Sequence, residues 1–139
     1  MSAMEPLCHL AGINSSKFTK EENFFLEAEF FIRTCEELEK FFKEKYKNYF
    51  LLMQFTTNKE NEMLETYFIR LIIKDILSTE EYTLEGIARY TDTHEDVVEE
   101  VFTGRNMNPS AIFLRRLIEL HRTTRRALYL AIMKKIAFE

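Results

Sequence analysis

The sequence predicts an all-α protein, because helix breakers are rare and apolar residues recur at helical spacing. The 139 residues include three Gly, two Pro and no Trp, against thirteen Phe. Long apolar and charged side chains with few breakers favour helix. From residue 24 onward, apolar residues follow one another at steps of three and four, which is the period of one helix face. The length suits about one domain, and neither a convincing strand pattern nor an internal repeat is present.

Residues 1–18 mix Pro, Gly, Asn and Ser, and we expect them to form a flexible tail. Residues 19–57 then predict one long helix, with its continuous apolar pattern over residues 21–53. The pattern is nearly a heptad seam, with one extra four-residue step that resembles a stutter. A helix of this length indicates a coiled coil or an oligomer. We therefore expect a homodimer whose interface includes Phe24, Phe31, Cys35, Leu38, Phe42 and Tyr49. The phenylalanines could instead form a platform for nucleic-acid bases, although aromatic residues at helical spacing are more often core.

Residues 60–139 are expected to form a domain that is helical throughout. After a polar break at residues 56–61, an apolar face predicts a helix that ends near Ser78. Thr83 should cap a short helix over "TLEGIARY". The tripeptide "TDT" follows as a turn, and "HEDVVEEVF" predicts the next helix, with a capping box formed by Thr93 and Asp96. Gly104 should end that helix.

The remaining chain predicts helix to its end. Asn108 followed by Pro109 should begin this segment as an N-cap with proline in the first helical position. The tetrapeptide "HRTT" either breaks the segment into two helices or does not. This segment carries an excess of cations, which form either a phosphate-binding surface or a solvated helix face: Arg115, Arg116, Arg122, Arg125, Arg126, Lys134 and Lys135. His121 is expected to be an ordinary helix-face residue.

Net charge, cysteine content and the length of the apolar runs restrict the class of function. The net charge is −4, so the chain as a whole lacks the excess of positive charge that indiscriminate nucleic-acid binding requires. Cys8 and Cys35 are too few for a disulfide framework and lack metal-ligand spacing, which fits a reducing compartment. The apolar runs are far shorter than the roughly 20 residues of a membrane span, and a signal peptide is not evident. Gly-rich phosphate loops and His-Glu-x-x-His are absent. We expect a cytoplasmic protein that is not an enzyme, with no cofactor, metal or membrane partner.

Several features of residues 83–121 form one recognisable pattern. They are Ile87 and Ala88 in a first short helix, a three-residue turn, Val97, Val98, Val101 and Gly104 in a second, and the loop to Asn108–Pro109. This pattern resembles the phage-repressor, Cro-like (XRE-type) helix-turn-helix family, over about residues 63–121 if the preceding helix is counted. The resemblance implies a bacterial transcriptional regulator that binds double-stranded DNA as a homodimer.

The resemblance also implies which residues contact DNA. In this family, the start and the outer face of the second helix enter the major groove. By position, Thr93, His94 and Glu95 would touch base edges. The first-helix end and the loop after the second helix would follow the phosphate backbone, which places Arg89, Arg105, Asn106 and Asn108 there.

The sequence departs from the family in its turn and in its charge. Asp92 stands where the family usually has Gly, and Thr93 where it has an apolar residue. Aspartate tolerates the left-handed backbone, so the turn should survive. The outer face of the second helix carries Glu95, Asp96 and Glu100, and one pair of like charges at about 4 Å costs about 1 kcal/mol even in water.

These carboxylates have three interpretations. One of them could accept from cytosine. Glu95 and Asp96 could simply favour the positive N-terminus of their own helix. Alternatively, the protein could be an interaction module that keeps the helix-turn-helix fold and whose acidic helix meets a basic protein partner.

Overall fold

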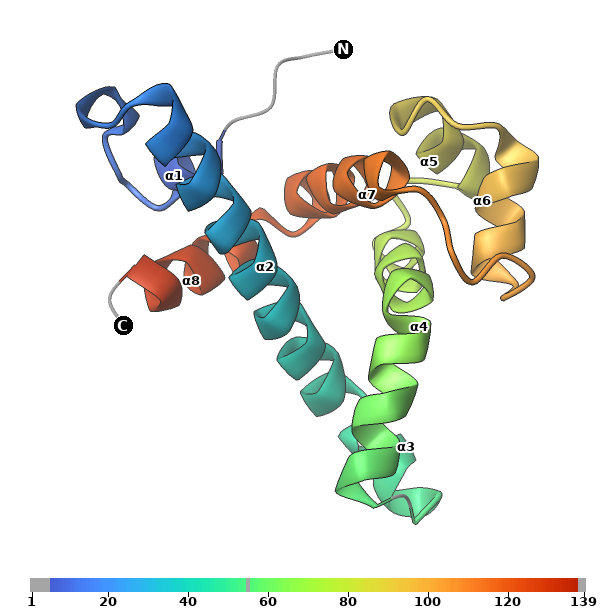
Figure 1. Cartoon of the computed structure of the whole chain (residues 1–139). Helices are drawn as coiled ribbons and strands as arrows, with labels where there is room; N and C mark the ends of the chain where they lie inside the picture. The colour runs from blue at the N-terminus through green and yellow to red at the C-terminus, as the bar shows by residue number, and fades with distance from the viewer. Residues whose placement is uncertain (1–5, 55, 138–139) are drawn as a thin grey trace. The chain divides into compact units, whose positions relative to one another are not determined.

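The computed structural model describes residues 6–54 and 56–137, and all regular structure in these ranges is helical (Figure 1). The predicted all-α class is therefore confirmed. Helices α1 to α4 cover Leu7–Leu10, Lys20–Lys45, Lys47–Leu52 and Thr57–Ser78, with a 3-10 turn at Ser15–Lys17. Helices α5 to α8 cover Leu84–Tyr90, Glu95–Phe102, Ala111–Thr124 and Arg126–Ala137. Within the described ranges, the helices are too short or too polar to cross a bilayer.

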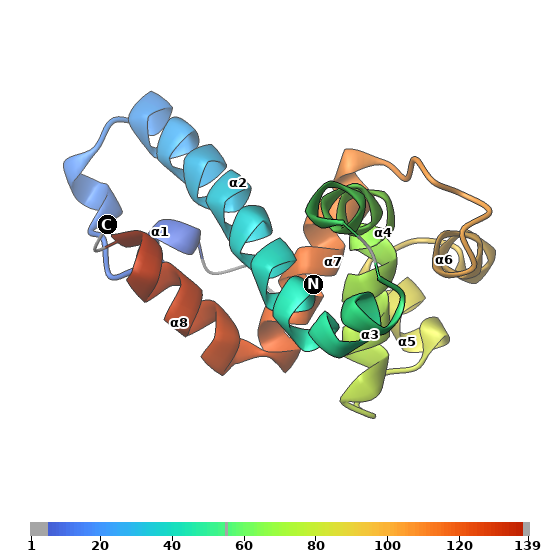
Figure 2. The ribbon, with the colours of Figure 1, turned by 90° about the horizontal axis from the view of Figure 1, so that it is seen from below.

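The chain divides into two compact units. The first combines residues 1–41 with residues 126–139, and the second is residues 42–125. This division differs from the expected boundary near residue 58, and it separates α8 from α4 to α7. The reason is that α8 packs with N-terminal elements, since α1 lies against it (Figure 2) and Lys135 on α8 forms a 2.9 Å ion pair with Glu37 on α2.

In the first unit, helix α1 departs from the flexible tail expected for residues 1–18. Its residues Leu7, Cys8 and Leu10 are buried. The backbone N–H groups of Leu7 and Cys8 donate to the two carboxylate oxygens of Glu27 at 2.9 and 2.8 Å. Such bonds satisfy amides at the start of a helix that lack a partner within it. Burial, together with the nearby Glu27 carboxylate, raises the pKa of the Cys8 thiol to about 12, so the thiol stays protonated at neutral pH.

The long helix predicted over residues 21–53 is wrong beyond Lys45. Tyr46 leaves the helical conformation, with φ −104° and ψ 16°, and α3 begins at the next residue. The break changes which face is inside: Phe50, which lies off the predicted seam, is buried, whereas Tyr49 on the seam is 51 % exposed.

Two residues of the predicted dimer seam lie inside the chain. Leu38 and Phe42 are fully buried, which leaves them no exposed surface for a second copy. The ring of Phe42 lies 6.2 Å from that of Phe68 on α4, centroid to centroid, and stacks at 6.3 Å on His121 of α7. Phe31 and Cys35 are half-buried, and Phe24 is 69 % exposed. Burial, followed by the charges of Glu39 and Glu36, raises the pKa of the Cys35 thiol to about 11.

In the second unit, α4 and α7 form a scaffold that carries α5 and α6. Helix α4 contacts both α7 and α6, and α5 contacts both α6 and α7 (Figure 1). The inner face of α4 supplies the core through Leu64, Phe68, Ile72, Ile73 and Ile76. The predicted end of this helix at Ser78 is confirmed, whereas its start is Thr57, inside the expected polar break, with the Thr56 hydroxyl accepting from the N–H of Lys59.

The other helix ends in the second unit match the sequence in part. Thr83 caps α5 as predicted, since its hydroxyl accepts from the N–H of Gly86 at 3.1 Å. The cap of α7 is Ser110 and not Asn108, because the Ser110 hydroxyl accepts from the N–H of Phe113. The chain breaks after Thr124, so "HRTT" does separate two helices.

Candidate nucleic-acid interface

The turn between α5 and α6 is built by hydrogen bonds of its own residues. Thr91 is fully buried, and its hydroxyl donates to the carbonyl of Ile87 at 2.8 Å. Asp92 has φ +52°, a left-handed conformation that residues other than Gly, Asn and Asp rarely adopt. The backbone N–H of Thr93 then donates to the carbonyl of Ala88 at 2.9 Å. The expectation that aspartate would permit the turn is thus confirmed.

Apolar contacts fix α6 against α5 beneath this turn. Ile87 and Ala88 on α5 are buried, as are Val98 and Val101 on α6. The small side chain of Ala88 allows the two helices to approach closely. On the opposite face of α6, Glu95, Asp96 and Glu99 are exposed, and Glu100 is half-buried.

Arg116 on α7 holds the same turn from the other side. Its Nη1 atom donates to the carbonyl of Thr91 at 3.0 Å and lies 3.9 Å from the Asp92 carboxylate. The sequence placed Arg116 among cations of a phosphate-binding or solvated face. The structure instead places it between α7 and the turn, a position that its neighbours along the chain do not indicate.

The start of α6 differs from the predicted capping box. The cap is His94, whose Nδ1 atom accepts from the backbone N–H of Asp96 at 3.2 Å. The hydroxyl of Thr93 donates to the carbonyl of Thr91 at 3.1 Å and takes no part in the cap. Of the predicted base-contacting residues, Thr93 is therefore a half-buried turn residue, while His94 and Glu95 are exposed at the end of the helix.

Arg70 on α4 holds the other end of α6. Its Nε–H donates to the carbonyl of Phe102, the last residue of α6, at 2.9 Å. Gly104 follows with φ +82°, where a Cβ atom would lie 3.3 Å from Nη1 of Arg70. The predicted helix stop at Gly104 is confirmed, and both the backbone conformation and the nearby guanidinium disfavour a larger residue there.

The predicted phosphate-contacting residues lie at the end of α5 and after the end of α6. Arg89 is exposed, and its guanidinium forms a 2.6 Å ion pair with Glu85. Arg105 is also exposed, 3.9 Å from Glu99. The side-chain oxygen of Asn106 accepts from the backbone N–H of Asn108 at 3.1 Å, so Asn106 shapes the loop. Thr93, His94 and Glu95 lie at the opposite end of α6 from this loop.

The electrostatic character of this surface is acidic. Residues 83–110 contain six carboxylates and two arginines, and each of those arginines has a carboxylate neighbour. Exposed pairs of this kind are weak, on the order of 0.2–1 kcal/mol, so either arginine can exchange its partner for a phosphate at little cost. The surplus of carboxylates nevertheless opposes a polyanion.

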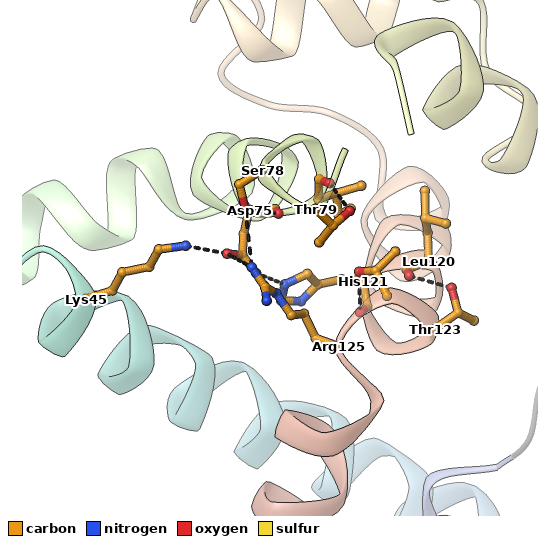
Figure 3. A network of polar contacts seen from close by, with 10 residues as sticks. Lys45, Asp75, Ser78, Thr79, Leu120, His121, Thr123 and Arg125 are labelled. Carbon is orange, nitrogen blue, oxygen red and sulfur yellow. Dashed lines mark hydrogen bonds and ion pairs between the residues drawn. The ribbon is translucent and has the colours of Figure 1, made fainter. Parts of the chain in front are cut away.

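A buried polar cluster supports the scaffold behind this surface (Figure 3). The carboxylate of Asp75 on α4 is fully buried and lies 2.6 Å from Nε2 of His121 on α7. Arg125 donates to both of its oxygens, at 3.0 and 3.1 Å, and Lys45 donates to one of them at 2.5 Å. Burial alone would raise the pKa of Asp75, but hydrogen bonds from His121, Arg125 and Lys45 outweigh it and hold the pKa well below its usual value.

This cluster changes the interpretation of the C-terminal basic segment. His121 and Arg122 are buried, and Arg125 is about two-thirds buried against Asp75, so none of the three lies on a solvated helix face. The sequence did contain one signal, an aspartate within the apolar run "LIIKDIL". A carboxylate inside such a run is rarely buried without charged partners.

The described residues show no group of three His, Cys, Asp or Glu side chains that could hold a metal ion. Comparison with protein-family models, with curated proteins and with solved structures found no match for this chain.

Proposed function

We propose that the protein is a DNA-binding transcriptional regulator that reads DNA with the N-terminal end of α6. The observation that carries this proposal is the turn at Asp92, whose left-handed backbone and bonds to Ala88 and Arg116 fix the angle between α5 and α6. A helix held in this way, with its outer face exposed, is the arrangement that enters a major groove.

In this proposal, His94 and Glu95 contact base edges. Both are exposed at the start of α6, and a glutamate can accept a hydrogen bond from the exocyclic amine of cytosine. Arg89, Arg105, Asn106 and Asn108 contact phosphates, and Thr93 supports the turn. Because carboxylates outnumber cations on this surface, non-specific affinity is expected to be low and specific base contacts to carry most of the binding.

Self-association through α2 belongs to the same proposal. The side chains of Phe24, Phe25 and Ile32 are 69, 62 and 54 % exposed, which leaves a strongly apolar surface on the first half of the helix. A two-fold interface at this surface would bring two helix-turn-helix modules to two half-sites, as regulators of this kind require. Leu38 and Phe42 are not part of it.

The test is fluorescence anisotropy on pooled genomic fragments from the source organism, over a salt series, with mass measured by light scattering. We expect a dimer to enrich particular fragments, and Arg105→Ala to weaken binding to all sequences and to lower the salt slope by about 1. Lys59→Ala on α4, also exposed, is the matched control and should change nothing. Equal affinities for Arg105→Ala and the native protein would remove Arg105 from the interface.

The excess of carboxylates supports a second candidate, an interaction module whose acidic helix binds a basic protein. The combined substitution Glu95→Gln, Asp96→Asn and Glu100→Gln separates the two. If it creates non-specific DNA binding where the native protein has none, the native face acts against DNA and the second candidate holds. If it abolishes a sequence-specific complex, the carboxylates read bases.

A further inference from the structure

A pocket of about 800 Å³ lies inside the second unit, between α3, α4 and the last residues of α6. Its size falls in the range of about 300–1,000 Å³ that is typical of small-molecule sites. Five aromatic rings line it, those of Tyr46, Tyr49, Phe50, Tyr67 and Phe102. A surface of this kind suits the apolar body of a ligand.

Two cations line the same pocket, Arg70 and Lys74, and none of the lining residues that the structure describes carries a carboxylate. The guanidinium carbon of Arg70 lies 4.8 Å from the ring centre of Tyr67, and Nζ of Lys74 lies 5.2 Å from that of Tyr46. Over residues 6–54 and 56–137, Arg70 and Lys74 form no ion pair with an acidic side chain. In a chain with net charge −4, two cations beside aromatic rings and away from carboxylates make a local site for negative charge.

Arg70 has donors left for such a charge. A guanidinium has five N–H donors, and within the described part of the chain only the Nε–H of Arg70 makes a hydrogen bond, with the carbonyl of Phe102. Its terminal nitrogens can therefore bind both oxygens of a carboxylate, the geometry that arginine prefers. Lys74 is exposed and makes no hydrogen bond in the described ranges, so it can turn toward the same group.

We propose that this pocket binds a small organic carboxylate with an alkyl or aromatic body. The body lies among the rings of α3, α4 and α6, and the carboxylate binds Arg70 and Lys74. Because Arg70 also holds the last carbonyl of α6, the ligand stabilises the end of that helix. The site stands independently of whether α6 reads DNA.

Binding is tested on the full chain with anilinonaphthalene sulfonate, an aromatic anion whose fluorescence rises in apolar sites. Three ten-carbon competitors below their micelle concentrations then test the charge preference: decanoate, decanol and decyltrimethylammonium. We expect saturable one-to-one binding of the dye and displacement by decanoate at concentrations where decyltrimethylammonium has no effect. Absence of saturable binding, or equal displacement by all three competitors, would overturn the proposal.

Two matched lysine variants on α4 locate the site. Lys74→Gln removes the pocket cation that makes no hydrogen bond within the described part of the chain. We expect it to weaken binding of the dye and of decanoate about fivefold, which corresponds to the free energy of one partly exposed ion pair. Lys59→Gln changes an exposed lysine outside the pocket and should leave both affinities unchanged. Circular dichroism checks that both variants fold. If the two variants bind equally well, the anion is not held by Lys74 and the assignment fails.

Discussion

At the scale of single residues, Asp75 joins three parts of the second unit through its carboxylate. One buried carboxylate holds Lys45, His121 and Arg125, which come from the end of α2, from α7 and from the residue before α8. Taking a carboxylate out of water is costly, and only such a set of donors makes it favourable. Removing the carboxylate would leave cations facing one another with no negative partner.

Substitution of this residue gives the first stability prediction. Asp75→Asn should lower the free energy of unfolding at pH 7 by about 3 kcal/mol, the usual effect of removing one partner from a buried charged cluster. Urea unfolding measures the change. Glu65→Gln, an exposed position on the same helix, is the control and should change stability by less than about 0.5 kcal/mol.

The same substitution predicts a pH dependence. The pKa of Asp75 in the folded protein is held below its unfolded value of 3.8. Its contribution is therefore complete above about pH 4 and is lost as the pH falls below that value toward the folded pKa. The stability difference between the native protein and Asp75→Asn should shrink in urea titrations from pH 5 to pH 3. A difference that stays constant over this range would show that the charge of Asp75 is not what stabilises the fold.

Asp92 and Asp75 show what the sequence could and could not predict at this scale. The left-handed turn at Asp92 depends on its neighbours along the chain, so the short-range pattern was enough to place it. The partners of Asp75 lie 30, 46 and 50 residues away, and nothing in local periodicity selects them. Arg70 and Arg116 were missed for the same reason, because each binds a backbone carbonyl of a distant element.

At the scale of elements, the one irregular step in the apolar pattern of α2 coincides with the break in the helix. The steps between apolar residues alternate between four and three except at one extra four-residue step, from Phe42 to Tyr46. The helix breaks at Tyr46. A continuous coiled coil would absorb this irregularity as a stutter. The chain instead bends there, which buries Phe50.

The turn between α5 and α6 gives an element-scale prediction. Asp92→Val places a β-branched residue at φ +52° and should lower the free energy of unfolding by about 1–2 kcal/mol. Asp92→Gly is the matched comparison, because glycine adopts this conformation without strain, and it should stay within about 0.5 kcal/mol of the native protein. Urea unfolding of both variants measures the effect. Equal stabilities would mean that the turn changes its backbone at little cost.

At the scale of the whole molecule, two units share one chain, and the second is continuous in sequence. Residues 42–125 contain helices α3 to α7, among them α5 and α6 with the turn between them, and every residue of the Asp75 cluster. The expected boundary near residue 58 would have cut Lys45 and α3 away from that unit. Sequence periodicity could not show this, because it identifies helices and not which of them pack together.

Fragments test this division. The fragment of residues 42–125 should fold by itself with a cooperative urea transition followed by circular dichroism. The fragment of residues 60–125 lacks Lys45 and part of α4, and it should be less stable by at least about 2 kcal/mol, since it loses one charged partner of a buried carboxylate and apolar contacts of α3. If both fragments unfold at the same urea concentration, the unit begins after residue 60.

The binding of Lys45 and Arg125 to one carboxylate also has a topological consequence. The second unit begins and ends at neighbouring points in space, within reach of two long side chains that meet on Asp75. Segments whose ends lie close together can be inserted into a host chain or circularly permuted without disturbing either partner. Residues 42–125 thus resemble a domain inserted into another one, because they interrupt the sequence of the first unit between residues 41 and 126. A short peptide joining residue 125 to residue 42, with new termini opened in the loop that follows α6, should yield the same helix-turn-helix in a different chain order.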